Sequence, residues 1–370
     1  SSDETMRVWT LYNFGEDLIA CYRGGAVYYW DSSSGTSSRA VDITTLVGAS
    51  DTPTEANTLI VSDASRFLIL FGTTDYLSGA FDPMLVRWAD QESLTDWTPS
   101  VENQAGSVRL SHGSEIITAQ QMRQEIVILT DSSVYSLQYV GAPYVWGAQL
   151  LADNISVISQ NAATVASGVM YWMGVDKFYR YDGRVQTLNC DLRRHVFGDI
   201  NLQQAEQTFC STNEGFNEVW WFYCSADSTT VDSYVIYNYL ENVWYYGTMA
   251  RTAWIDSGLS DYPIAATYSY NLVEHENGLN DNETGTPAAI NAYITSAEFD
   301  IGDGHNFGFV WRVLPDLTFR GSTSTTPTVT FSLLALQNSG SGYNDPESVG
   351  GEYYAPVART ASVPVEQFTG

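Results

Sequence analysis

The 370-residue chain has little of what most catalytic chemistry requires. An enzyme needs a poised nucleophile, acid or metal cluster, and here no two histidines have the spacing of metal ligands. The cysteines are scattered, with no close pair of the zinc or redox type. The four histidines and four cysteines are His112, His195, His275, His305, Cys21, Cys190, Cys210 and Cys224. The sequence therefore predicts no catalytic residue, no metal site, no cofactor and free buried thiols. One disulfide between Cys210 and Cys224, across a hairpin, remains open.

Basic residues are also scarce. Lysine and arginine together number 16 against 43 acidic residues, which gives a net charge of −27 and a pI near 4.2. The basic surface that binds nucleic-acid phosphates or an anionic membrane is therefore missing. Two interpretations of the acidity stay open. One is solubility in a salty or crowded medium, and the other is a surface that must not hold nucleic acid, such as a channel wall.

The sequence also has no long apolar runs and little helical periodicity. No apolar stretch reaches membrane-spanning length, and the polar, acidic start of the chain is no signal peptide. The first residue is Ser1 and not methionine, so we expect a processed chain or a part of a longer protein. Short helices are predicted only at 89–96, 191–197 and 202–207.

What the chain has in abundance is aromatic strands. Aromatic residues make up 14% of it, with 24 tyrosines and 11 tryptophans, and flat rings suit the pleated surface of a sheet. A short sequence motif, an aromatic-rich strand followed by a polar turn, recurs at 26–31, 85–90, 133–137, 177–183, 234–239 and, more weakly, 271–278. We call this motif the aromatic phrase. Its central residues are 59, 48, 44, 57 and 38 apart. A period of roughly 40 to 50 residues is that of one propeller blade.

Most of these phrases follow a partner strand across a short turn, as in antiparallel hairpins. Such partners are predicted at 66–72, 125–130, 169–173 and 218–223. The fold class predicted is thus all-β, a β-propeller over residues 1–280, with its blades from roughly 10 to 280. After a polar loop at 280–287, longer strands are expected at 290–299, 307–319 and 329–337. Residues 281–370 are therefore predicted to be additional C-terminal β-strands, packed on the propeller or closing it.

Several candidate sites have an ordinary structural alternative. His112 lies beside serines but in no nucleophile elbow, so a turn residue is expected. Asp300 and Asp303 could bind calcium, but the helix-flanked loop is missing and a hairpin turn fits better. The acidic loops 225–232 and 274–283 are interpreted as solvated turns. The aromatic strings 220–223 and 244–246 could stack sugars or bases, although blade packing explains them more simply.

Several sequence motifs of the chain resemble those of a known protein family. The segments 216–223, 234–239 and 243–247, together with 87–92, 96–99 and 314–321, are similar to the propeller-containing hub or nozzle proteins of short-tailed bacteriophages, also called DNA-stabilisation proteins. The resemblance covers most of residues 60–335. Family members are often longer than this chain.

The resemblance implies a non-enzymatic virion component located in the phage tail. Such proteins form a ring, commonly of six copies, below the portal and tail adaptor. The ring extends the DNA ejection channel, helps retain the packaged genome and carries fibres or spikes. DNA is expected to pass without specific binding, because an acidic wall offers phosphates no counterion release. No membrane binding is expected. The alternatives are a propeller enzyme acting on sugars and a fibre-attachment or capsid-surface virion protein.

Overall fold

The computed structural model describes residues 6–63 and 65–290, and shorter stretches beyond. The shorter stretches are 292–294, 296, 302, 311–312, 317–319, 324–333 and 357–362. The chain divides into two compact units, Ser1–Ala289 and Ile290–Gly370. The sequence had suggested a boundary at 280/281.

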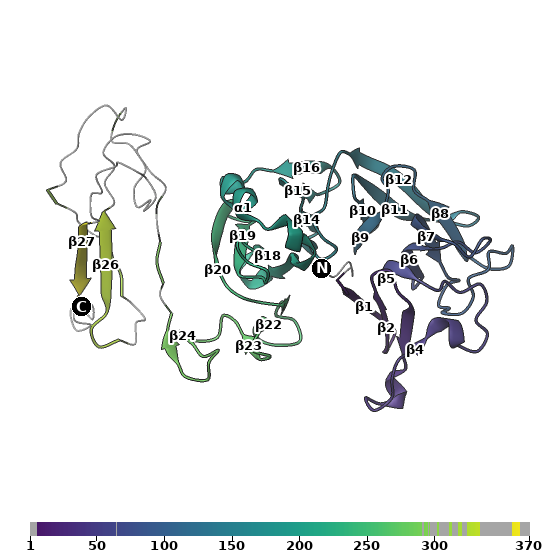
Figure 1. Cartoon of the computed structure of the whole chain (residues 1–370), viewed down its shortest axis with the longest axis horizontal. Coiled ribbons are helices and arrows are strands. Elements are labelled where there is room, and N and C mark those ends of the chain that lie inside the picture. The colour runs from purple at the N-terminus through teal and green to yellow at the C-terminus, as the bar shows by residue number, and fades with distance from the viewer. Residues whose placement is uncertain are drawn as a thin grey trace. The chain divides into compact units, whose positions relative to one another are not determined.

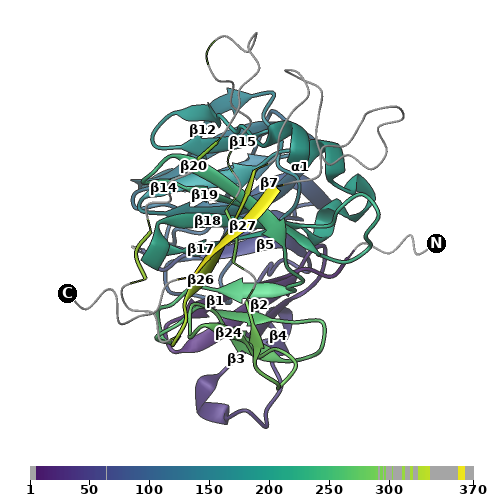
Figure 2. The same cartoon turned by 90° about the vertical axis from the view of Figure 1, so that its left-hand side faces the viewer.

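The first unit is a six-bladed β-propeller, in which antiparallel sheets are arranged around a ring (Figure 1). The first strand of each blade lies innermost, where it contacts the first strand of the next blade. Every recurrence of the aromatic phrase forms the third strand of a successive blade, so the predicted propeller fold is confirmed. Figure 2 shows the strands of the fifth blade side by side.

The strands follow one another in simple up-and-down order within each sheet. Blade 1 consists of β1 (Trp9–Phe14), β2 (Asp17–Tyr22), β3 (Val27–Trp30) and β4 (Val41–Asp42). Blade 2 consists of β5 (Ala56–Val61), β6 (Leu68–Thr74), β7 (Phe81–Trp88) and β8 (Gly106–Arg109). Blade 3 consists of β9 (Ile116–Gln121), β10 (Ile126–Thr130), β11 (Ser133–Gly141) and β12 (Val145–Asp153). Blade 4 consists of β13 (Ala163–Ala166), β14 (Val169–Met173), β15 (Phe178–Tyr181) and β16 (Val185–Leu188). Blade 5 consists of β17 (Phe209–Asn213), β18 (Glu218–Tyr223), β19 (Ser233–Asn238) and β20 (Val243–Thr248). Blade 6 consists of the three strands β21 (Ala253–Ile255), β22 (Ile264–Ala266) and β23 (Leu272–Glu274).

Helical turns occur only between strands in the described part of the chain. They are α1 (Arg193–Asp199) and the 3-10 turns η1 (Ser32–Ser34), η2 (Ile43–Thr45), η3 (Leu202–Gln207) and η4 (Glu214–Phe216). The sequence predicted α1 and η3 approximately. The helix predicted at 89–96 is wrong. The Ser93 hydroxyl accepts from the backbone N–H groups of Thr95 and Asp96, which closes a compact loop instead.

The core lies between the blades, because each sheet presents apolar side chains on both faces. Four clusters of buried side chains fill the gaps between successive blades from the first to the sixth. In β5 all six residues are buried, since blades pack on both of its faces. The largest cluster joins blades 3, 4 and 5 around the fully buried Trp172 and Trp221.

The end of the chain is described only in part. A short pair, β24 (Asn280–Asp281) with β25 (Ala288–Ala289), ends the first unit. In the second unit β26 (Thr328–Leu333) pairs antiparallel with β27 (Val357–Ser362). The strand predicted at 329–337 thus lies partly in β26, whereas most of 290–299 and 307–319 lies outside the described residues. Within the described residues, no helix is both long and apolar enough to cross a membrane.

Candidate functional site at the propeller axis

Polar side chains connect blades that face each other across the ring. Gln160 lies just before β13 of blade 4, and its Nε2 donates to Oγ1 of Thr10 in β1 at 2.8 Å. The same group is 3.4 Å from the carbonyl oxygen of Asn57 in β5. Blades 1 and 4 are opposite one another in a ring of six blades, so this side chain crosses the axis. Gln160 is 3% exposed, and its Oε1 has no hydrogen-bond partner among the described residues.

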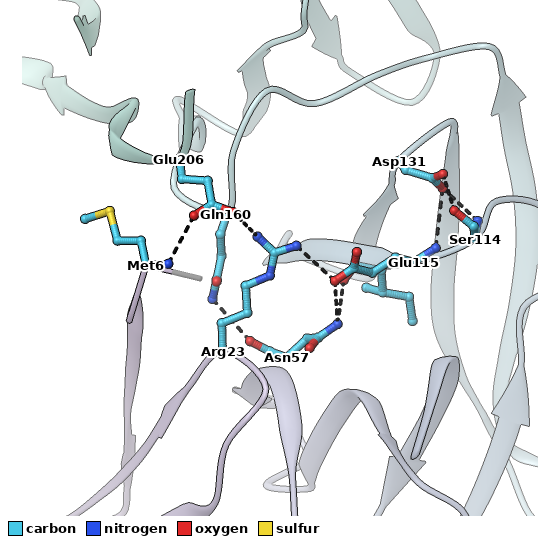
Figure 3. Close-up of polar contacts among 9 residues, drawn as sticks. Met6, Arg23, Asn57, Ser114, Glu115, Asp131, Gln160 and Glu206 are labelled. Atoms are coloured by element: carbon cyan, nitrogen blue, oxygen red, sulfur yellow. Dashed lines mark hydrogen bonds and ion pairs between the residues drawn. The ribbon is translucent and has the colours of Figure 1, made fainter. Parts of the chain in front are cut away.

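Arg23 is the charged centre of the same region. It leaves the turn after β2 and donates from Nη2 to Glu115, just before β9, at 2.9 Å. Its Nη1 lies 3.7 Å from Glu206 of η3. Asn57 also donates to Glu115, and the backbone N–H of Met6 donates to Glu206 (Figure 3). The guanidinium is only 14% exposed, so one arginine joins blades 1 and 3 to the segment before blade 5.

We call this set the axial network. Its members are Thr10, Arg23, Asn57, Glu115, Gln160 and Glu206. The network closes the centre of the single propeller to anything as wide as a nucleic-acid duplex, since direct hydrogen bonds span it. It also holds no nucleophile, and both carboxylates contact one arginine. The arrangement is therefore suited to holding blades together through hydrogen bonds and ion pairs.

Seven described arginines are bonded to groups of the protein itself, Arg23 among them. Arg66, Arg109, Arg180, Arg193 and Arg251 each approach a carboxylate of this chain. Arg87 is buried and donates to three backbone carbonyl oxygens. The densest basic pair in the sequence is Arg193–Arg194, and its first member bonds both the backbone carbonyl and the carboxylate of Asp176. These arginines therefore already have partners within the chain.

The histidines are dispersed and engaged separately. His112 lies in a turn, where its N–H donates to the Tyr135 hydroxyl; the neighbouring Ser114 hydroxyl donates to Asp131. The ring of His195 packs against Tyr246. Burial first, and then the charge of Arg251, lowers the pKa of His275 to about 4, and its Nε2 accepts from Arg251. His305, Asp300 and Asp303 lie outside the described residues. No cluster of metal-ligating side chains occurs within the described residues.

The thiols are held in a state that is poorly suited to nucleophilic attack. Burial raises the pKa of Cys21 and Cys190 to about 12 and that of Cys224 to about 11, and also raises that of Cys210. All four cysteines are free, so the disulfide left open between Cys210 and Cys224 is not formed. A protonated thiol is a weak nucleophile at neutral pH.

The acidic loops bind their own backbone and side chains. In loop 225–232 the Asp232 carboxylate accepts from both the N–H and the hydroxyl of Ser225. In loop 274–283, Glu283 pairs with Arg251 at 2.9 Å, and Glu276 accepts from Asn213. Burial is the main cause that raises the pKa of Glu218, with the nearby charge of Glu276 adding to it. These acidic side chains thus have local structural partners.

A groove of about 470 Å³ lies between blades 1 and 2. Tyr12, Asn13, Val61, Asp63 and Arg66 contribute to its lining. Glycoside hydrolysis requires two carboxylates across a cleft, and this groove has one, Asp63. The aromatic strings are no better suited to sugars, because Trp220 to Tyr223 are all buried in blade 5. The string at 244–246 differs, since Tyr245 and Tyr246 are exposed on the outermost strand β20.

Comparison with known proteins shows the fold alone. No family model and no curated protein matches the chain. Solved propeller structures do match. They include the extracellular domain of the putative one-component system BT4673 from B. thetaiotaomicron (11% identity, TM-score 0.45, 78% of this chain and 34% of that one) and Kluyveromyces marxianus Hsv2 (9%, 0.40, 72% and 74%). The dihydro-heme d1 dehydrogenase NirN is a third (12%, 0.41, 72% and 57%). The chain thus spans about a third of the length of the BT4673 extracellular domain.

Sequence reasoning did not find the axial network. Its members come from distant turns and strand starts, and none belongs to a motif. A weak signal was available in the polar run Ser159-Gln160-Asn161, which directly precedes the inner strand of blade 4. Polar groups there must find partners once the ring forms, because buried polar atoms are costly when unpaired.

Proposed function

We propose that this chain is a structural protein of a bacteriophage virion, a subunit of the tail hub or nozzle. Its copies, commonly six in the family that the chain resembles, would form a ring below the tail adaptor. The ring would extend the DNA ejection channel, help retain the genome and anchor fibres or spikes. The proposal starts from the resemblance of 216–223, 234–239 and 243–247, which form the last three strands of blade 5.

The observation that carries the proposal is the state of the charged side chains. The chain has a net charge of −27, and seven of its described arginines are bonded to its own carboxylates or carbonyls. Such a surface repels phosphates and gains nothing from counterion release. This is the property that a channel wall needs if DNA is to slide past it.

The axial network bears on where that DNA would run. Gln160 and Arg23 join blades across the propeller centre, so a duplex cannot thread one subunit. A channel would have to lie between copies, and this requires a ring of several subunits. The exposed aromatic side chains on β20 are suited to contacts with neighbouring subunits or tail proteins.

The deciding experiment is quantitative mass spectrometry of purified phage particles, with antibody labelling against this chain in electron micrographs. We expect a fixed stoichiometry of several copies per particle and label at the tail below the portal. Label on the capsid surface would favour the fibre-attachment or capsid alternative. Absence from washed particles would refute a virion role altogether.

A further inference from the structure

One gap in the propeller is not packed. The four buried clusters cover the contacts from blade 1 through blade 6, but none joins blade 6 back to blade 1. No hydrogen bond or ion pair links the described residues of these two blades either. We call this gap the seam. The strands on either side of the seam, β22–β23 and β1–β2, are labelled in Figure 1.

Both sides of the seam are apolar. On blade 1, Trp9 and Leu11 of β1 are 50% and 58% exposed, and Tyr22 and Tyr28 share their face of the sheet. These residues form the blade 1 face. The innermost strand of blade 2, by contrast, is buried along its whole length. The exposure of β1 therefore reflects a missing neighbour and not a polar sequence.

Blade 6 presents a matching face. Ile255 of β21 pairs with Ile264 of β22, and Leu272 of β23 pairs with Ala266. Ile255 and Leu272 are 63% and 77% exposed. The opposite side of the same sheet carries Trp254, which stacks on Trp220 of blade 5. These four residues, Ile255, Ile264, Ala266 and Leu272, form the blade 6 face, which is aliphatic where the blade 1 face is aromatic.

The charges beside the two faces are also complementary. Arg7 lies over the Tyr22 ring at 5.6 Å, is exposed and pairs with no carboxylate among the described residues. Glu274 stands on the same side of blade 6 as Ile264 and is exposed. The aromatic blade 1 face thus has an arginine beside it, and the aliphatic blade 6 face has a glutamate beside it. Both faces border the seam. Interfaces pair apolar centres and opposite charges in this way.

The two blades that border the seam are held by contacts on their other sides. The axial network ties blade 1 to blade 4 through Gln160 and to η3 through Arg23. Blade 6 is tied to blade 5 by the Trp254–Trp220 stack and its surrounding cluster. Neither set of contacts reaches across the seam.

We propose that the seam is the subunit contact, with the blade 6 face of one copy packed against the blade 1 face of the next. This contact is head-to-tail, so its repetition closes a ring or extends a filament. The inference deepens the proposed function, on which it rests, by naming the surfaces through which copies of the ring would join.

Cysteine cross-linking of the full chain tests the contact. Leu11→Cys and Leu272→Cys are made separately and together, and the single variants are mixed in equal amounts under mild oxidation. We expect a covalent heterodimer from the mixture, and a ladder of multimers from the double variant. Val101→Cys with Leu272→Cys is the matched control, because Val101 is fully exposed on blade 2 and outside both faces. It should give no specific dimer above the wild-type background.

The other outcomes each overturn the inference. A cross-link within one chain of the double variant would show that the seam closes on itself. Absence of any cross-link, with circular dichroism matching that of the wild type, would show that another polypeptide covers the faces or none does. A charge test is independent of cysteine. Arg7→Glu and Glu274→Arg should each weaken self-association about tenfold, an effect of order 1.4 kcal/mol, and mixing them should restore it.

The proposed function and the seam contact can fail separately. If the chain occurs at fixed stoichiometry in virions but gives no seam cross-link, the virion role stands and the contact is wrong. If the ladder forms but the chain is absent from particles, the contact stands and the virion role is wrong.

Discussion

Arg23 and Glu115 lie 2.9 Å apart, although they come from the first and third blades of the ring. The arginine is largely buried, and its carboxylate partner also accepts from Asn57. The pair therefore links two non-adjacent blades by charge near the propeller axis.

Replacing Arg23 with methionine should lower the free energy of unfolding by about 1–3 kcal/mol, because Glu115 loses its main partner near the axis. Arg66→Met is the matched control. Arg66 and Glu92 are 67% and 62% exposed, so their pair should contribute less than about 1 kcal/mol. Urea unfolding followed by tryptophan fluorescence measures both. Equal effects would mean that the axial network has no special role in stability.

Arg87 should not tolerate lysine. Its guanidinium donates to the carbonyl oxygens of Thr74, Asp51 and Trp97, and it is 2% exposed. A lysine ammonium cannot reproduce this planar set of donors. We expect Arg87→Lys to cost about 2–4 kcal/mol, since buried carbonyl oxygens lose their donors. Thermal unfolding by circular dichroism would show it, and an unchanged melting temperature would contradict the assignment.

Trp221 and Tyr246, both in blade 5, should differ sharply in their effect on stability. Trp221 is fully buried and donates to the carbonyl oxygen of Ala162 in the neighbouring blade at 3.1 Å. Trp221→Ala is expected to cost about 3–5 kcal/mol through the cavity it leaves. Tyr246 is 54% exposed, so Tyr246→Ala should cost about 1 kcal/mol or less. Similar losses for the two would show that blade 5 is packed differently.

Stability should fall as the pH is lowered from about 6.5 toward 4, because of His275. Its pKa is lowered from 6.5 to about 4 in the folded chain, so in this window the unfolded state binds a proton that the folded state does not. The contribution is complete above pH 6.5 and is lost on acidification. Many carboxylates titrate nearby, so the measurement is the difference between wild type and His275→Gln in urea midpoints at pH 4, 5.5 and 7. A difference independent of pH would refute the shift.

The chain should show no measurable affinity for duplex DNA, even at low salt, where electrostatic attraction is strongest. Fluorescence anisotropy of a labelled duplex at low ionic strength is the test. Asp176→Asn is an informative companion, because it removes the carboxylate charge beside Arg193 and Arg194 and should still give no binding. Micromolar binding of the wild type that weakens steeply with added salt would reveal a basic track and overturn the passive-channel interpretation.

Local sequence was enough to predict the blades. The aromatic phrases at 133–137 and 234–239 became third strands because alternating rings suit a sheet that is packed on both faces, and the turns between strands need only neighbouring residues. The segment 89–96 shows the limit. Its composition allowed a helix, but Ser93 bonds the backbone of Thr95 and Asp96, and side-chain hydrogen bonds of this kind compete with helix formation.

The sequence by itself determined the strand period and the acidic charge, since these depend on composition and on spacing along the chain. Only the tertiary structure decided that Gln160 would reach Thr10, that Arg23 would join three parts of the ring, and that β1 would stay exposed while β5 is buried. The physical reason is that these contacts depend on where each blade sits around the ring. That position results from packing between sheets and is not encoded in any short segment.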